Sequence, residues 1–383
     1  MKLGPARIAW LQISHQKLRL LAAVLGVAFA VVLIFVQMGF QQALYDSSVR
    51  WHTALGYDLA VISPKTTYLV SPPSFPRNRL YQVLGHDGVS SVTPVYIGIA
   101  EWRNPLDPLK ARNIYVMGFD PMNSGFALAG DSAPLRMPDR VLFDRLSRPE
   151  FGPIADMIAA GVEVSTELNG RNITVAGLYE LGTSFGIDGS IITSDLNFRR
   201  IFPARPAARI ELGLVLLEPG ADLAAVRDNI VAGIPGDVVV LTREEFIRHE
   251  VSYWSDNTPI GYVFGLGVAM GLAVGLIVVY QILFSDVQDH LREYATMKAM
   301  GYSNFFLSRL VLSEAVILAV LGYIPGYFAS LAVYTQARGA TNLPVMMNQE
   351  RALMVLGLTV LMCAVSALLA MRKLRSADPA EVF

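Results

Sequence analysis

The chain has 383 residues, of which 53% are hydrophobic and only 16% are charged, and its mean hydropathy is +0.43. A soluble globular protein carries about 25% charged residues, so this composition predicts a membrane protein. The formal net charge of −1 excludes the overall basic field typical of a nucleic-acid-binding protein. The single cysteine, Cys363, lies in an apolar run and has no partner for an intramolecular disulfide.

Four segments are long and apolar enough to cross a bilayer, whose hydrocarbon core of about 30 Å requires roughly 20 helical residues. They are residues 18–40, 259–284, 310–334 and 352–371. The first is predicted to be a retained anchor, because its apolar run exceeds the roughly 7–15 residues of a signal peptide. In the third, Pro325 is expected to introduce a kink. Glu314 is expected to reach the membrane interface or to pair with Arg309 or with a partner protein.

Basic residues near the ends of these spans predict the orientation of the chain. They gather in residues 1–17, expected to form an amphipathic helix, in residues 285–309, and in the tail 372–383. Four spans place these three segments on one side of the membrane, which the positive-inside rule makes cytoplasmic. Residues 41–258 and the short loop 335–351 are therefore predicted to lie outside the inner (plasma) membrane.

The long segment 41–258 is predicted to be a mixed α+β domain, which makes the fold class an α-helical membrane protein with a large extracytoplasmic insertion. Asn169-Gly170 between two β-type runs is a strong hairpin signal. Thr242 and Glu245 form a capping-box pattern that predicts a helix leading toward the second span. Further helices are expected at 76–84, 139–147 and 221–232, and strands at 57–63, 89–99, 112–118, 189–193, 210–217 and 237–241.

The sequence lacks several motifs that enzymes use to bind nucleotides or metal ions. A P-loop requires a Gly-Lys dipeptide to hold nucleotide phosphates, and the sequence contains none. The five histidines form no His-Glu-x-x-His pair, and no metal site is predicted. Residues 182–186 (GTSFG) match the Gly-x-Ser-x-Gly pattern of a hydrolase, but turn residues follow where that motif requires a helix. A glycine-rich loop is the better interpretation, and the chain is not predicted to be an enzyme.

A row of small residues marks the second span, where Gly267, Gly271 and Gly275 recur every four residues. Small residues at this spacing allow two membrane helices to approach closely. The row is equally consistent with a contact between two copies of the protein and with tight packing inside one four-helix bundle.

The segment between the second and third spans predicts a helix over 286–301 with one apolar stripe. Gly301 is a natural helix stop. A helix of this kind lies passively on the membrane surface or docks into a groove on a cytoplasmic partner. The stripe consists of Leu291, Tyr294, Met297 and Met300.

The same segment carries a family resemblance. Residues 292–303 (REYATMKAMGYS) resemble the signature of the FtsX-like permeases, the membrane components of the MacB, Lol and FtsX class of ABC systems. The ending 378–383 (DPAEVF) is similar to a tail common in that group, and the layout of one span, a large outside domain and three spans matches along the chain. Residues 10–12, 17–21, 37–40, 43–47 and 182–189 look most like the DevC branch, named for heterocyst-type glycolipid export.

The resemblance implies a set of partners. A separate cytoplasmic ABC ATPase subunit would bind ATP and magnesium, so this chain would bind no cofactor. A second copy of the permease, a periplasmic membrane-fusion adaptor and, through it, a TolC-like outer-membrane channel would complete the exporter, with the lipid membrane around the spans and no nucleic acid. The residues implied to couple to the ATPase are Leu291, Arg292, Glu293, Tyr294, Met297, Lys298, Met300 and Gly301.

The expected substrate is a lipid, a glycolipid or a peptide. Nearly charge-free spans favour a mechanism in which movement, rather than substrate, passes through the membrane. Two other functions of the same class stay open: an FtsX-like transmembrane signal transmitter that controls periplasmic partners, and a permease that extracts lipids or lipoproteins.

Overall fold

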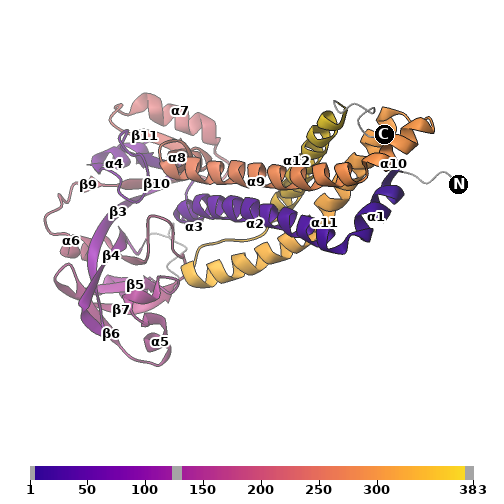
Figure 1. Cartoon of the computed structure of the whole chain (residues 1–383). Coiled ribbons are helices and arrows are strands. Elements are labelled where there is room, and N and C mark those ends of the chain that lie inside the picture. The colour runs from indigo at the N-terminus through magenta and orange to yellow at the C-terminus, as the bar shows by residue number, and fades with distance from the viewer. Residues whose placement is uncertain (1–4, 123–131, 376–383) are drawn as a thin grey trace. The chain divides into compact units, whose positions relative to one another are not determined.

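The computed structural model describes residues 5–122 and 132–375 (Figure 1). The chain divides into two compact units. The helical unit contains residues 1–42, 260–338 and 345–383, and the inserted domain contains residues 43–259 together with 339–344. Most of the tail 372–383, including its DPAEVF ending, lies outside the described residues.

The helical unit consists of long apolar helices and two short ones. Its helices are α1 (Pro5–His15), α2 (Lys17–Ser48), α9 (Pro259–Asp289), α10 (Leu291–Ala299), α11 (Asn304–Thr341) and α12 (Gln349–Arg375). Four of them, α2, α9, α11 and α12, are long and apolar enough to cross a membrane. The predicted fold class is therefore confirmed, with the domain inserted between the first and second of these helices.

All four long helices extend beyond the apolar runs that predicted them. Helix α9 continues to Asp289, whereas the run ended at residue 284, and α11 begins at Asn304 and includes Pro325. Hydropathy marks only the apolar part of a helix, while backbone hydrogen bonding continues into polar turns. The helix predicted over 286–301 is therefore divided, because its first residues belong to α9 and a break at His290 separates them from α10.

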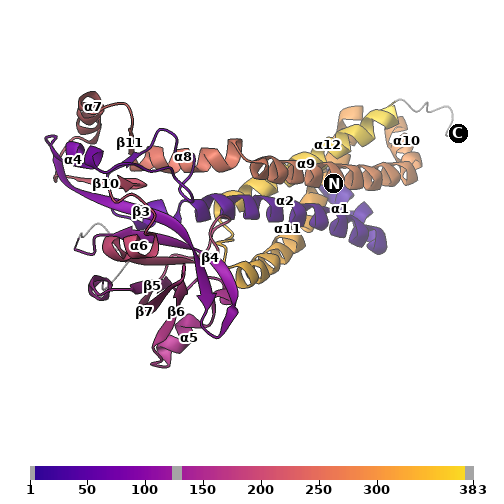
Figure 2. The same ribbon diagram turned by 90° about the vertical axis from the view of Figure 1, so that its left-hand side faces the viewer.

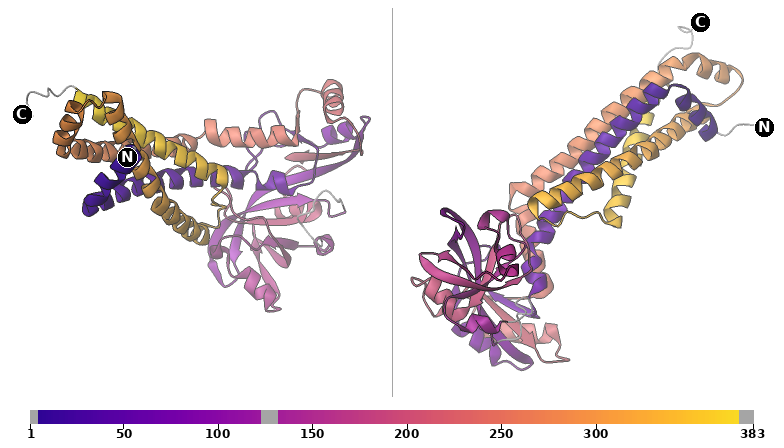
Figure 3. Two further views of the ribbon diagram at one scale, coloured as in Figure 1. Left: turned by 90° about the vertical axis from the view of Figure 1, so that its right-hand side faces the viewer. Right: turned by 90° about the horizontal axis from the view of Figure 1, so that it is seen from below.

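The glycine row of α9 packs against α2 of the same chain, and Figure 3 shows the two helices side by side. A methyl group added at Gly271 would lie 3.1 Å from the Ile34 side chain. A methyl group added at Gly267 would meet the Gln37 side chain, and one added at Gly275 would meet Met362 of α12 as well as Ala30 of α2. In this structure the row packs against other helices of the same chain.

A second glycine pair, which the sequence analysis did not recognise, brings α11 onto α2. Methyl groups added at Gly322 and Gly326 would meet the side chains of Val27 and Val31. Both glycines are buried in α11. Helix α2 is thus the common partner of α9 and α11, and close backbone approach rather than side-chain bulk holds this part of the bundle together.

We expect Gly322→Ala to destabilise the helical unit by about 1–3 kcal/mol, the usual effect of adding bulk to a packed interior. The new methyl would collide with Val27 and lie 3.2 Å from the carbonyl oxygen of Val24. Thermal unfolding of the purified protein in detergent micelles measures the change. Gly265→Ala is the matched control, because nothing lies within 4 Å of its added methyl; equal melting temperatures for the two variants would contradict this packing.

The inserted domain is built on a nine-stranded sheet of order β11-β1-β10-β3-β4-β8-β5-β7-β6. Most neighbours are antiparallel, but β8 pairs parallel with β4, and β5 pairs parallel with β7. A two-stranded sheet of β2 and β9 accompanies it. The main strands are β1 (Leu59–Ile62), β3 (Val89–Asn104), β4 (Asp107–Phe119), β5 (Arg140–Asp144), β6 (Val164–Leu168), β7 (Arg171–Tyr179), β8 (Ser190–Ser194), β10 (Leu212–Leu217) and β11 (Val239–Thr242), and the short pair is β2 (Phe75–Pro76) and β9 (Arg209–Ile210).

Short helices lie around this sheet, and two apolar clusters form the core of the domain. Helix α6 packs on β3, β4 and β8, and Figure 2 shows it beside β3 and β4. The helices are α3 (Arg50–Ala54), α4 (Asn78–Leu84), α5 (Ile154–Ala159), α6 (Asp195–Ile201), α7 (Leu223–Gly233) and α8 (Arg243–Asp256), with 3₁₀ turns at Ala133–Arg136 and Pro149–Phe151.

Two local predictions are confirmed in this domain. Asn169 and Gly170 join β6 to β7 with φ angles of 47° and 75°, as a tight hairpin turn with two positive φ values requires. Thr242 and Glu245 form both hydrogen bonds of the capping box at the start of α8. Each signal resides in neighbouring residues, so distant parts of the chain could not override it.

The helix predicted over 139–147 is wrong, because residues 140–144 form strand β5. Val141, Leu142 and Phe143 are all buried, and the strand lies between β7 and β8. A short continuous apolar run does not distinguish a buried strand from a helix. Residues 140–144 form a strand because they pair with β7 and β8, which come later in the chain.

The GTSFG segment is a loop, as predicted, and a buried carboxylate holds it. Asp144 accepts hydrogen bonds from the backbone N–H groups of Leu181 (3.0 Å) and Gly182 (2.8 Å). Burial raises the pKa of Asp144, and these backbone N–H groups oppose that effect. Strand β8, rather than a helix, follows the loop, so a hydrolase elbow is absent from residues 182–194. The Thr183 hydroxyl also donates to the Thr341 carbonyl in segment 339–344 (3.2 Å).

Candidate functional site

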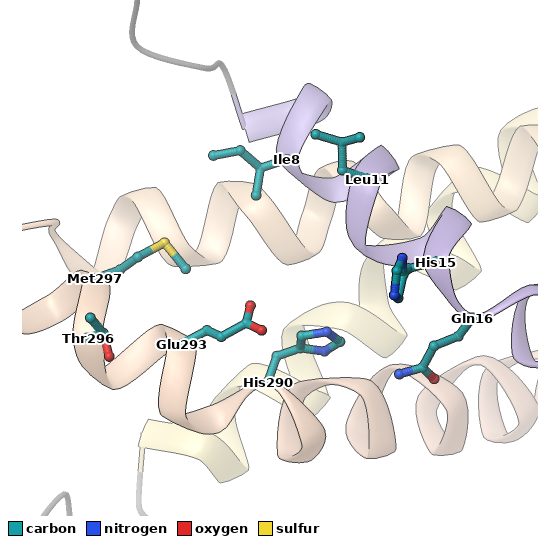
Figure 4. A pocket seen from close by; sticks show the side chains of 8 residues that line it. All are labelled: Ile8, Leu11, His15, Gln16, His290, Glu293, Thr296 and Met297. Carbon is teal, nitrogen blue, oxygen red and sulfur yellow. The ribbon is translucent and has the colours of Figure 1, made fainter.

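An open groove lies between α1 and α10, the helix that carries the family-like motif. Its volume is about 550 Å³. Figure 4 shows side chains of both helices, and of the residues just before α10, around the opening. The groove is lined by Ile8, Leu11, His15, Gln16, His290, Glu293, Thr296 and Met297.

The break between α9 and α10 and the end of α10 are set by local geometry. His290 precedes the first turn of α10 without a side-chain cap. At the other end Gly301 has a φ of 93°, and the Tyr302 N–H donates to the Met297 carbonyl (3.1 Å). This i to i−5 bond across a left-handed glycine is a Schellman stop, which makes α10 a short, well-bounded helix.

The apolar stripe of α10 is divided between the inside and the outside of the helical unit. Tyr294 is only 3% exposed, so it packs inward and is not a surface contact in this chain. Leu291 and Met297 are half-buried, whereas Met300 is 66% exposed. The accessible face of α10 therefore consists of the groove beside Met297 and a surface that carries Arg292, Glu293, Thr296, Lys298, Ala299, Met300 and Gly301.

Tyr294 packs toward a cluster of charged groups contributed by three other segments. Arg19 of α2 lies 2.5 Å from Asp289 and 3.8 Å from Asp286 at the end of α9. Glu314 of α11, 1% exposed, lines the same small cavity as Arg19 and Asp286. The cluster of Arg19, Asp286, Glu314 and Tyr294, here called the charged cluster, thus joins α2, α9, α11 and α10.

Asp286, Glu314 and Tyr294 of the charged cluster are buried, Arg19 is partly exposed, and the cluster is incompletely hydrogen-bonded. Buried atoms without a hydrogen-bond partner are Arg19 Nη2, Asp286 Oδ2, Tyr294 Oη and Glu314 Oε2. Its cavity of about 20 Å³ exceeds the roughly 10–15 Å³ that one water molecule needs. Burial, reinforced by the neighbouring carboxyl groups, raises the pKa of the Tyr294 phenol. Tyr294 therefore keeps its proton and can donate to a carboxylate or a bridging water.

Sequence reasoning found only part of this arrangement. Glu314 is buried and does not reach the membrane interface. Arg309 lies over the Phe305 ring and does not pair with Glu314. Arg19 and Asp286 were not singled out as functional residues, because their sequence separation hides that they are neighbours. Gly267, Gly271 and Gly275 contact α2 and do not belong to this site.

Although His15, His290 and Glu293 line the groove, no group of three or more His, Cys, Asp or Glu side chains within residues 5–122 and 132–375 is placed to hold a metal ion. The site is a shallow, partly apolar surface bordered by acidic and basic side chains, and such a surface suits contact with another protein.

The comparisons with known proteins agree with this layout. Residues 265–379 match the FtsX-like permease C-terminal family, and residues 20–232 match the MacB-like periplasmic core domain family. No match is found among curated protein sequences.

Two solved structures resemble part of the chain. One is the periplasmic region of MacB from Actinobacillus actinomycetemcomitans, with 9% identity and a TM-score of 0.35, covering 50% of this chain and 92% of that one. The other is the extracellular domain of the noncanonic ABC-type transporter YknZ from Gram-positive bacteria, with 13% identity and a TM-score of 0.33, covering 48% of this chain and 98% of that one. Since the MacB-like match alone spans more than half of the sequence, the chain belongs to the MacB/FtsX-type family of ABC permeases.

Proposed function

We propose that this permease works with a separate ABC ATPase subunit to export a lipid, glycolipid or peptide. The observation that carries the proposal is the position of α10: it directly follows a membrane-type helix, it ends at a glycine stop, and it presents an accessible face beside a groove. ATP and magnesium would be bound by the partner. The termini and α10 would be cytoplasmic, and the inserted domain would lie in the periplasm.

The proposed mechanism transmits movement rather than passing substrate through the bundle. Closure of the ATPase would displace α10, whose buried Tyr294 lies close enough to Glu314 of α11 and Asp286 of α9 to feel their charge. The displacement would thus act on α9 and α11 at once. Residues 339–344, which are the last residues of α11 and the first residues after it, belong to the inserted domain. The Asn342 amide donates to the Leu146 carbonyl there (3.5 Å).

The partners on the far side are proposed from the same reasoning. Substrate moved by the inserted domain would enter a periplasmic membrane-fusion adaptor and a TolC-like outer-membrane channel, as the similarity to the DevC branch suggests. A second copy of this chain would complete the permease. Apolar side chains on the outside of α9 remain for lipid or for that copy: Tyr262, Leu266, Met270 and Ile277, which are 71%, 46%, 59% and 53% exposed.

Purification of the detergent-solubilised protein from its native membrane tests this function. We expect an ATPase with a P-loop and a periplasmic adaptor to copurify. An adaptor distinguishes export from signalling, because an FtsX-like signal transmitter would bring down a cell-wall hydrolase instead. A different permease subunit in place of a second copy would favour lipid or lipoprotein extraction. Recovery of no ATPase would overturn the proposal.

A further inference from the structure

A cavity in the inserted domain is lined by arginine and aromatic side chains that have no part in the proposed function. It lies between α6 and the loop that leads from α6 to β9, and its volume is about 270 Å³. Three arginines and three aromatic rings form most of its lining: Arg199, Arg205, Arg209, Tyr96, Phe198 and Phe202.

The positive charge of the cavity comes from one short stretch of sequence. Residues 199–209 (RRIFPARPAAR) contain four arginines and no acidic residue. Arg200 binds Asp139 (2.7 Å) and is not part of the lining. The other three arginines face one acidic group in the lining, Glu211, so the cavity keeps an excess of positive charge.

Several contacts hold the Arg205 side chain at the cavity although it is partly exposed. It donates to the Ile97 carbonyl (2.5 Å) and to Glu211 (3.0 Å). Its guanidinium lies 5.1 Å from the ring centroid of Phe202 and 5.6 Å from that of Phe198. Glu211 uses its second oxygen to accept from the Ile97 N–H (3.0 Å), which makes this acid a structural counter-ion. A preorganised cation requires little reordering when an anion arrives.

Arg199 retains binding capacity that the domain does not use. Its Nη2 donates to the Tyr96 hydroxyl (2.9 Å), and Asp195 lies 3.7 Å away. Its Nε is buried and has no hydrogen-bond partner. An unpaired, buried donor of a charged group is unfavourable unless a ligand accepts its hydrogen bond. Arg209 of β9 also lines the cavity, and its Nε donates to the Ser74 hydroxyl (2.8 Å). A guanidinium offers five N–H donors, and these bonds occupy only some of them.

We propose that this cavity binds a phosphate group, carried as free phosphate or as the headgroup of an anionic amphiphile. Arginine side chains bind phosphate through pairs of N–H donors, and donors from α6 and from β9 can approach a tetrahedral anion from different directions. Ligand pockets usually measure about 300–1,000 Å³, so a cavity of about 270 Å³ suits a headgroup rather than a whole lipid. This site is distinct from the groove between α1 and α10, and its proposed role is separate from ATPase binding.

Binding to the full-length protein in detergent micelles tests the site by isothermal titration calorimetry with two probes, inorganic phosphate and dihexanoyl phosphatidic acid. Arg199→Gln should weaken binding of the preferred probe by about 10- to 100-fold, as loss of a hydrogen bond to a charged group does. Arg200→Gln is the matched control, because it removes the same charge from the same helix without altering the lining. It should change affinity less than about threefold.

The two probes distinguish the sources of the phosphate. Equal affinity assigns the site to free phosphate, and tighter binding of the phosphatidic acid assigns it to a headgroup. Arg209→Gln provides a second test from a separate segment, and it should weaken the same probe. Binding of neither probe, or equal losses in Arg199→Gln and Arg200→Gln, would overturn the proposal. Because both measurements are made without the ATPase, their failure leaves the coupling proposal intact.

Discussion

Met297→Glu is expected to weaken binding of the ATPase by at least about tenfold, which corresponds to a loss of about 1.4 kcal/mol at an interface. Met297 is half-buried on the wall of the groove, and the new carboxylate would lie one helical turn from Glu293. Like charges at this spacing repel each other, and a charge in the groove would lose water on docking. Copurification of the ATPase, followed by ATP hydrolysis in the eluate, measures the change.

The control for this prediction is Met137→Glu. Met137 lies in the inserted domain and is 60% exposed, so the same chemical change there should leave ATPase binding at the wild-type level. The Met297→Glu variant should keep its melting temperature, because the site of substitution is only half-buried. Wild-type export and wild-type ATPase recovery by a folded Met297→Glu variant would contradict the coupling role of α10.

Arg19→Met is expected to reduce the free energy of unfolding by about 3 kcal/mol, near the lower end of the range for a buried charge that loses its partner. Arg19 is the basic partner of both Asp286 and Asp289, and its side chain is 22% exposed, which moderates the effect. Without it, Asp286 would remain buried without a counter-charge. Unfolding of the purified protein in detergent micelles measures the loss.

Two further variants separate charge from packing in the charged cluster. Lys17→Met removes an exposed cation from the same helix and should leave stability nearly unchanged. Arg19→Lys keeps the charge and should recover much of the stability lost in Arg19→Met. If Arg19→Met and Lys17→Met proved equally stable, the charged cluster would not hold the four helices together.

The sequence was sufficient for features that depend on neighbouring residues. Long apolar runs predicted the four membrane-type helices, Asn169-Gly170 predicted the hairpin, and Thr242 with Glu245 predicted the start of α8. Each of these signals arises within about one turn or one span of the chain. The glycine row of α9 was recognised as a packing surface, but its partner α2 could be identified only in three dimensions.

The functional site was less accessible to sequence reasoning, because its parts are far apart in the chain. Arg19 and Glu314 are almost 300 residues apart, yet they line one cavity. Tyr294 belonged to a regular apolar stripe, and spacing alone did not reveal that it turns inward while Met300 stays exposed. Strand β5 was predicted as a helix for a similar reason, since its partners β7 and β8 lie later in the sequence.

The central proposal is that the accessible face of α10 contacts an ATPase, and cysteine-directed cross-linking tests it most directly. Cys363 is the one cysteine in the sequence and is buried, so a Cys363→Ala background carrying Met300→Cys places a single thiol on the exposed end of α10. Met137→Cys in the same background is the control. In native membranes we expect Met300→Cys, and not Met137→Cys, to cross-link a protein that contains a P-loop. An ATPase cross-linked only from Met137→Cys, or from neither position, would contradict the proposal.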